Sequence, residues 1–170
     1  MGDPKKTKKS YKSPAHPWRK ERIDIEKAVK KDYGFKNKTE IWKMETVLNS
    51  FKRQAKRLVK IKTEQTKKEQ ELFIKKLLKF GFIGEGSKLE DVLGLELRNI
   101  LDKRLQSVVL KKGIANTVKQ ARQLITHGHI LIGSKKINSP SYLVNLEEEN
   151  LVTLSPKSTF VNSKQEVKAE

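Results

Sequence analysis

The sequence predicts an α+β protein in which an N-terminal bundle of helices precedes a small mixed domain. Three patterns predict this arrangement: an apolar stripe at helical spacing in residues 41–58, a helix–turn–helix pattern in residues 101–128, and a hairpin pattern directly after it. We therefore expect a basic extended arm at 1–19, a helical domain at 20–95, a mixed domain at 96–154 and a flexible tail at 155–170.

The helical domain is expected to begin with a helix from about Arg19 to Tyr33, which Gly34 closes. A longer helix starts near Thr39, whose hydroxyl is a suitable N-cap. Apolar residues recur along this second helix at three- and four-residue steps, which is the spacing of a core-facing stripe. The stripe consists of Ile41, Met44, Leu48, Phe51, Ala55 and Leu58.

A third helix opens with Thr66-x-x-Glu69, the spacing of a capping box in which two side chains satisfy free backbone amides. Its inward-facing residues are expected to be Leu72, Phe73, Leu77 and Phe80. Gly81 ends this helix, because glycine enters the left-handed conformation without steric cost. A short helix at residues 87–93 completes the domain.

The mixed domain begins with the helix–turn–helix. Its first helix ends in a basic segment before Gly113 and carries an apolar face made by Leu101, Leu105, Val108 and Val109. Thr117-x-x-Gln120 is a capping box that starts the second helix, which runs to His127 and stops at Gly128. The second helix is expected to direct Val118, Ala121, Leu124 and Ile125 inward.

Strands are expected after this second helix. The apolar run 130–132 is followed by Gly133-Ser134, which suits a two-residue type II′ turn because that turn needs glycine at its first central position. Glu147-Glu148-Glu149 is expected to form a polar turn before a final strand at residues 151–154.

The composition points to a polyanion as the partner. The chain has 170 residues, a formal net charge of +18 and an apolar fraction of 35%, so each core must be small. A polyanion is the simplest explanation for so much unbalanced charge, since self-repulsion otherwise destabilises a compact protein. Zero cysteines exclude disulfides and thiolate metal sites. The sequence shows no membrane span and no signal peptide, so we expect an intracellular, soluble protein.

Basic and polar side chains fall into three groups that could bind RNA phosphates. The arm and the start of the first helix contribute Lys5, Lys6, Lys8, Lys9, His16, Trp18, Arg19 and Arg22. The second helix contributes Lys52, Arg53, Lys56 and Arg57. The mixed domain contributes Arg104, Lys111, Lys112, Asn116, Thr117, Lys119, Gln120, Arg122, Gln123, His127, Lys135 and Lys136.

Each group has a plainer explanation. The charges could be the solvated faces of small domains, although the size of the combined set favours binding. Trp18 could dock onto the chain's own helices or stack on RNA while the neighbouring arginine pairs with phosphate. We expect the arm to become ordered on RNA.

Catalysis and cofactors are not expected. His127 and His129 have no nucleophile or paired carboxylate near them in the sequence, so they more naturally pack at a helix–strand corner or contact RNA. The acidic run 147–149 has no nearby histidine and makes a weak metal site. We therefore predict a protein that is not an enzyme, with no metal and no cofactor.

Several segments resemble a known family. The run from Ala121 to Ile130 and the later Pro140-Ser141-Tyr142 are similar to the S4 RNA-binding domain. Residues 2–6, His16-Pro17-Trp18 and Glu21-Arg22 resemble the opening of the archaeal and eukaryotic form of the small-subunit ribosomal protein family named for that domain. The resemblance covers residues 1–155, and it departs from the family at the hairpin, where Gly133-Ser134 replaces the usual Asn-Gly.

The resemblance implies a cytoplasmic structural constituent of the small ribosomal subunit. Such a protein would bind the 5′ domain of small-subunit ribosomal RNA, nucleate assembly, and contribute to decoding accuracy where messenger RNA enters. Its partners would be that RNA, neighbouring ribosomal proteins and messenger RNA. The alternative is a general RNA-binding protein or RNA chaperone that acts off the ribosome. A basic membrane-surface protein is disfavoured, since no helix shows the exposed aromatic and leucine face that insertion needs.

Overall fold

The computed structural model describes residues 9–61, 63–84, 86–156 and 158, and it has the α+β architecture that the sequence predicts. Lys5, Lys6 and Lys8 and nearly all of the predicted tail lie outside these residues. The helices come first: α1 (Lys20–Asp32), α2 (Lys38–Lys60), α3 (Glu64–Phe80), the 3-10 helix η1 (Asp91–Gly94), α4 (Leu97–Asp102), α5 (Leu105–Lys111) and α6 (Val118–Thr126). Strands β1 (Ile130–Ile132) and β2 (Lys135–Lys136), helix α7 (Leu146–Asn150) and strand β3 (Val152–Leu154) follow.

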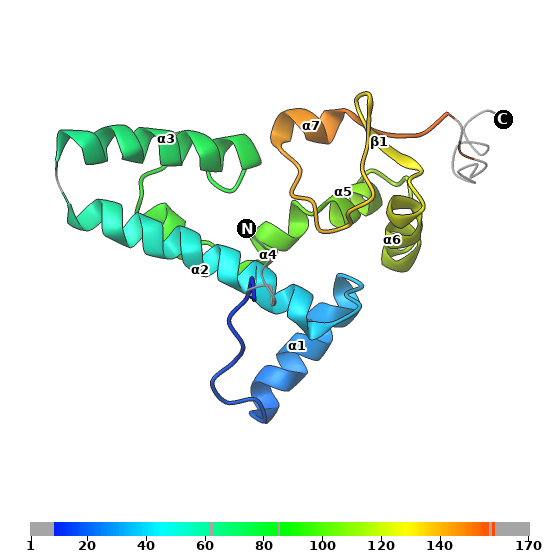
Figure 1. Cartoon of the computed structure of the whole chain (residues 1–170), viewed down its shortest axis with the longest axis horizontal. Coiled ribbons are helices and arrows are strands. Elements are labelled where there is room, and N and C mark those ends of the chain that lie inside the picture. The colour runs from blue at the N-terminus through cyan, green and yellow to red at the C-terminus, as the bar shows by residue number, and fades with distance from the viewer. Residues whose placement is uncertain (1–8, 62, 85, 157, 159–170) are drawn as a thin grey trace, which may run out of the picture.

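The buried residues form two separate hydrophobic cores. The first core runs from Phe35 to Leu101 and includes the whole predicted stripe of α2. The second runs from Leu105 to Val152 and includes Ala121, Leu124 and Ile125 of α6. We call α1 to α4 the N-lobe and α5 to β3 the C-lobe. In Figure 1, α2 and α3 lie side by side in the N-lobe, and α5, α6 and β1 lie together at the other end of the molecule.

The apolar stripe that begins at Leu101 does not belong to one helix. The chain leaves the helical conformation at Arg104, whose ψ is 142°, and the stripe is divided between α4 and α5. Residues 142–144 cause this break by pairing with the backbone there: the Leu105 amide donates to the Tyr142 carbonyl at 2.8 Å, and the Val144 amide donates to the Lys103 carbonyl at 2.9 Å. Leu101 therefore packs in the first core, and Leu105 packs in the second.

Two predicted helix caps are wrong. Helix α2 begins near Thr39, as predicted, at Lys38, but its N-cap is Asn37 and not Thr39. Helix α3 begins at Glu64, because the reciprocal capping pair is Thr63 with Thr66 and not Thr66 with Glu69. Side chains other than Glu or Gln can complete this pattern, since the Thr66 hydroxyl accepts from the Thr63 amide at 2.8 Å.

Two further expectations also need correction. Leu72 does not face inward, since it is 66% exposed, whereas Phe73 and Leu77 are buried. The acidic run at 147–149 lies in the short helix α7 rather than in a turn. The Asn145 amide donates to the Glu148 carboxylate at 3.1 Å at the start of that helix, and Glu149 pairs with Lys103 at 3.0 Å.

The hairpin forms as predicted within a three-stranded antiparallel sheet of order β2-β1-β3. Ile132 pairs with Lys135 across the turn, and Leu131 pairs with Thr153 on the other side. Gly133 has a φ of 59°, and among the described residues only glycines have positive φ, so the turn is of the type II′ kind.

Candidate nucleic-acid interface

One carboxylate of the N-lobe pairs with two arginines that follow it far along the chain. Glu40 in the first turn of α2 accepts hydrogen bonds from Arg104 at 3.1 Å and from Arg122 of α6 at 3.0 and 3.2 Å. The Arg104 guanidinium also lies over the Phe35 ring, 4.3 Å from its centroid. We call Glu40, Arg104 and Arg122 the Glu40 latch. It connects an N-lobe residue to Arg104, which directly precedes α5, and to Arg122 of the C-lobe, 64 and 82 positions away in the chain.

The latch corrects the prediction for Arg104, and it changes the interpretation of Arg122. Arg104 was expected on an exposed face, but only 1% of its surface is exposed, so no phosphate can reach it in this conformation. Arg122 has a quarter of its side chain exposed and uses its guanidinium on Glu40. Replacing Arg122 would therefore disturb the contact between the lobes as well as any contact with RNA.

Two carboxylates, the buried Glu26 and the partly buried Glu40, are held in the charged state. Burial alone raises the pKa of Glu40, but hydrogen bonds and charges from Arg122 and Arg104 outweigh it and lower the pKa below its ordinary value. Burial likewise raises the pKa of Glu26, and it is outweighed by hydrogen bonds from Trp42 and Lys38 and by the charges of Arg22 and Lys38. The net direction is downward for both groups.

These shifts predict a loss of stability in acid. A carboxyl group with a lowered folded-state pKa stabilises the fold fully above its ordinary pKa of 4.5 and less as the pH falls toward the folded value. We expect the free energy of unfolding, measured by urea titration, to decrease steadily as the pH is lowered from about 4.5. The Glu40→Gln variant should show a smaller decrease over the same range, and an identical decrease in both proteins would contradict this role for Glu40.

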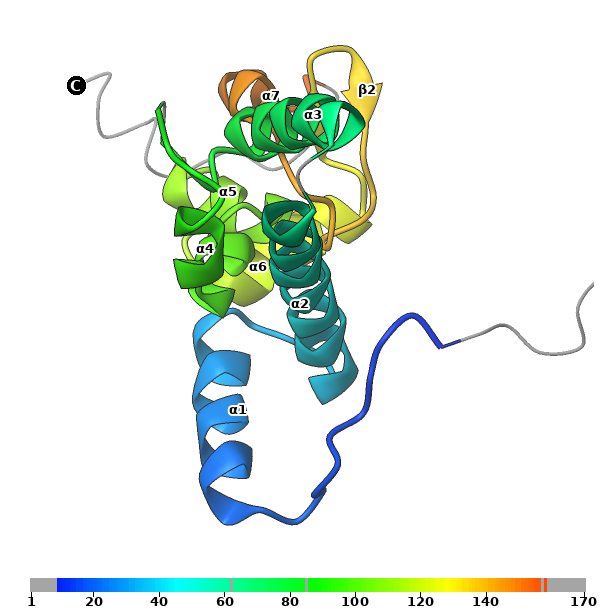
Figure 2. The ribbon, with the colours of Figure 1, turned by 90° about the vertical axis from the view of Figure 1, so that its left-hand side faces the viewer.

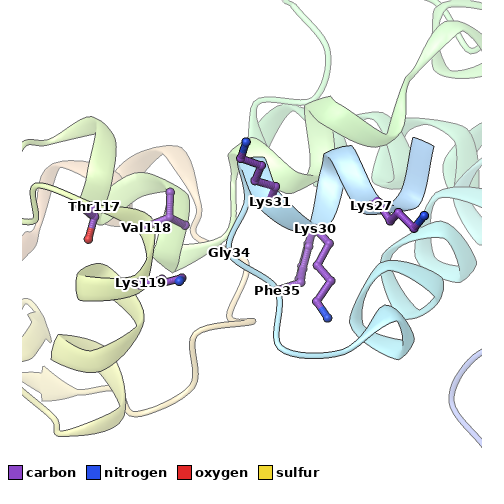
Figure 3. Close-up of a pocket in the computed structure, with 8 residues that line it drawn as sticks. All are labelled: Lys27, Lys30, Lys31, Gly34, Phe35, Thr117, Val118 and Lys119. Atoms are coloured by element: carbon purple, nitrogen blue, oxygen red, sulfur yellow. The ribbon is translucent and has the colours of Figure 1, made fainter. Parts of the chain in front are cut away.

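A basic cleft lies between the lobes, beside the latch. Its volume is about 550 Å³, and Lys27, Lys30 and Lys31 of α1 line one side while Thr117, Val118 and Lys119 line the other (Figure 3). The α1–α2 turn forms the floor at Gly34 and Phe35. Gly34 has a φ of 60°, and a Cβ there would fall 2.8 Å from a methyl carbon of Val118. Glycine therefore permits the close approach of the lobes that creates this cleft.

The cleft is positively charged from both sides. Lys30, Lys31 and Lys119 are exposed and form no ion pair with another described residue, while Lys27 pairs with Asp24 at 3.2 Å. The α6 N-terminus adds partial positive charge, because its first backbone amides have no helical acceptor. Sequence reasoning missed the three α1 lysines. Their three- and four-residue spacing puts them on one side of α1, but only the fold shows that this side faces α6.

The α6 start is capped largely as predicted. The Thr117 hydroxyl accepts from the Gln120 amide at 3.2 Å, but the Gln120 side chain accepts from the Asn116 amide at 2.8 Å rather than from that of Thr117.

Most of the predicted RNA-binding residues of the C-lobe are on the surface. The exposed ones are Lys111, Lys112, Asn116, Thr117, Lys119, Gln123, His127, Lys135 and Lys136. Lys111 pairs with Asp102 at 2.9 Å, so its charge is partly neutralised.

The other predicted groups lie elsewhere. Lys52, Arg53, Lys56 and Arg57 are on the C-terminal half of α2, which runs toward α3 and away from α6 (Figure 1). Within the arm, Lys9, His16 and Arg19 are exposed. Arg22 is half-buried and holds the arm by donating to the Pro17 carbonyl at 2.7 Å and by pairing with Glu26. Trp18 is 89% exposed, so it does not dock onto the chain's own helices.

The described residues show neither a metal site nor a membrane span. They contain no group of histidines and acids that could hold a metal ion. In the same part of the chain, no helix combines the length and apolar character needed to cross a membrane. The exposed lysines and backbone amides of the cleft can bind anions.

Comparison with known proteins identifies the family. Residues 103–150 match the S4 domain, which contains the C-lobe side of the cleft. The chain is similar to proteins named small ribosomal subunit protein uS4. It is 48% identical to that of Methanococcus aeolicus over 95% of this chain and 92% of the relative. It is 43% identical to that of Saccharolobus solfataricus over 94% and 89%, and 44% identical to that of Methanothermobacter thermautotrophicus over 93% and 92%. The chain therefore belongs to the uS4 family of small ribosomal subunit proteins, in its archaeal type.

Proposed function

We propose that this protein is a structural constituent of the small ribosomal subunit that binds the 5′ domain of small-subunit ribosomal RNA. In this role it nucleates assembly, contacts neighbouring ribosomal proteins, and contributes to decoding accuracy where messenger RNA enters. Its place of action is the cytoplasm. The observation that carries the proposal is the cleft between the lobes, to which each lobe contributes exposed lysines. The family assignment supports the same role and makes the chain a structural protein rather than an enzyme.

A cleft with two charged walls suits folded RNA better than an extended strand. The major groove of an A-form helix is too narrow for side chains to read, so proteins recognise folded RNA by its shape and by its phosphates. Lysines on α1 and α6 can each neutralise a different backbone segment where two helical arms of RNA approach each other. The Glu40 latch fixes the distance between the two walls, so that the protein selects an RNA geometry rather than a sequence.

A competition experiment tests this proposal. The full chain is bound to labelled 5′-domain RNA near physiological salt and challenged with excess transfer RNA, duplex RNA and DNA. We expect the 5′-domain complex to survive the challenge. Equal displacement by every competitor would indicate a general RNA-binding protein or chaperone and would contradict the ribosomal role.

The cleft lysines provide the variant for the same assay. We expect replacement of Lys30, Lys31 and Lys119 by alanine to weaken 5′-domain binding. The affinity should also fall less steeply with salt: the magnitude of the negative slope of log affinity against log salt should decrease by about 2 to 3. The matched control replaces Lys67, Lys75 and Lys79, which are exposed on α3, and removes the same charge. Equal losses in the two variants would show that net charge, rather than the cleft, determines the binding.

A further inference from the structure

The chain's two tryptophans line one pocket, which lies between the arm and the first turns of α1 and α2. Its volume is about 310 Å³, and its lining includes Pro14, Pro17, Trp18, Arg22, Lys38 and Trp42. In Figure 2 the arm runs from the start of α1 and passes alongside α2. We call it the tryptophan pocket. It is separate from the cleft between the lobes, with which it shares no lining residue.

One aromatic wall of the pocket is fixed in place. The Trp42 indole donates to the Glu26 carboxylate at 2.9 Å, and the Tyr11 ring packs against it with centroids 5.8 Å apart. Glu26 itself is buried and forms ion pairs with Arg22 and with Lys38, the latter at 3.0 Å. These contacts hold the Trp42 ring in one orientation before any ligand arrives, which reduces the entropy lost on binding.

The second tryptophan of the pocket has an exposed ring. Trp18 is 89% exposed, and an indole presents a large flat apolar face that gains free energy when another flat group covers it. A single exposed apolar side chain is common on protein surfaces and carries no argument by itself. Here, however, the exposed ring lines the same pocket as a second, fixed indole.

The surroundings of the pocket favour an anionic ligand. Arg22 and Lys38 provide two cations against the one carboxylate of Glu26. An adjoining hollow of about 400 Å³ shares Ser13, Pro14 and Arg22 with the tryptophan pocket. It adds Lys12, His16 and Arg19, against the carboxylates of Glu45, which lines it, and of Glu21, which pairs with Arg19 at 2.8 Å. The combined lining is rich in both aromatic rings and cations. A nucleotide has these two requirements, since its base stacks on aromatic rings and its phosphate pairs with cations.

We propose that the tryptophan pocket binds one unpaired nucleotide of single-stranded RNA, with its base against Trp18 and Trp42 and its phosphate toward Arg19 and Lys12. This inference rests on the proposed function only in taking RNA as the partner. It adds a second type of contact to the protein, because the cleft neutralises the backbone of folded RNA and the pocket captures a base that has left the stack. A protein segment is the competing occupant, and the basic lining favours the nucleotide over it.

Tryptophan fluorescence reports on this pocket directly, because both tryptophans of the chain line it. The full chain is titrated with an RNA hexanucleotide and, separately, with a hexanucleotide of the same length and charge that lacks all bases. We expect quenching by the first and little quenching by the second. Equal quenching by both would show that the pocket binds phosphate alone and would overturn the proposal. If neither oligomer quenches the fluorescence, the pocket does not bind a nucleotide, and a protein segment becomes the favoured occupant. That result would also overturn the proposal.

Variants sharpen the test. Trp18→Ala should weaken hexanucleotide binding about 5- to 150-fold, the range given by the loss of one base–aromatic stack, with Trp42 still reporting the titration. Trp18→Phe should retain most of the affinity, because phenylalanine also stacks. The matched control is Ile25→Ala, an exposed apolar residue on α1 that does not line the pocket. An equal loss of hexanucleotide affinity in the Ile25 and Trp18 variants would contradict the proposal. The ribosomal role is tested separately, by the competition experiment with 5′-domain RNA.

Discussion

Replacing Glu40 by glutamine is expected to lower the free energy of unfolding by about 3 to 5 kcal/mol, the cost of leaving a buried charge without its partner. Arg104 remains buried in the variant, and its guanidinium stays charged at neutral pH. An amide can accept a hydrogen bond from it but supplies no negative charge. Arg122 loses its bidentate partner in the same substitution.

Urea unfolding at neutral pH measures this effect. The control is Glu71→Gln, which removes the same charge from an exposed position on α3 and should change stability by less than about 0.5 kcal/mol. The variant should also bind 5′-domain RNA more weakly at a temperature where it remains folded, because the walls of the cleft are no longer held at one distance. Similar stability of the Glu40 and Glu71 variants would mean that the latch is only a surface ion pair.

Replacing Leu124 by alanine is expected to cost about 2 to 5 kcal/mol. Leu124 lies on the inward face of α6 and is 1% exposed, so the substitution removes buried methyl groups and leaves a cavity in the second core. Its neighbour Gln123 is exposed on the same helix, so Gln123→Ala provides the control for helix propensity. A loss below about 1 kcal/mol for Leu124→Ala would contradict the packing described for α6.

Local patterns predicted most of the fold. The stripe from Ile41 to Leu58 is buried at every predicted position, because it lies on one side of a single helix and that side packs against a single core. The type II′ turn at Gly133 follows from the conformation that glycine alone adopts easily. Helix starts were predicted less well. At Thr63 and Thr66, two hydroxyls provide the caps, a pattern that the search for Glu or Gln three residues later overlooks.

Features that depend on contacts between distant residues could not be predicted. Arg104 appears as a surface residue next to a helix, and only its pairing with Glu40, 64 positions away, explains its burial. The same holds for the break before α5, which residues 142–144 impose. Lys30 and Lys31 resemble any solvated pair of lysines until the fold places α1 opposite α6. The position of Trp42 beside Trp18 likewise becomes visible only once the arm is placed against α2.

The most direct test of the account is whether both walls of the cleft face the same part of the RNA. The chain contains no cysteine, so a single introduced cysteine carries a hydroxyl-radical probe at one known position. Lys31→Cys places the probe on the α1 wall, Lys119→Cys places it on the α6 wall, and Glu71→Cys places it on α3 as a control. We predict that the two cleft probes cleave the same or adjacent nucleotides of the 5′ domain and that the α3 probe cleaves a different set. Separate cleavage sites for the two walls, or no cleavage from either, would contradict a shared RNA-binding cleft between the lobes.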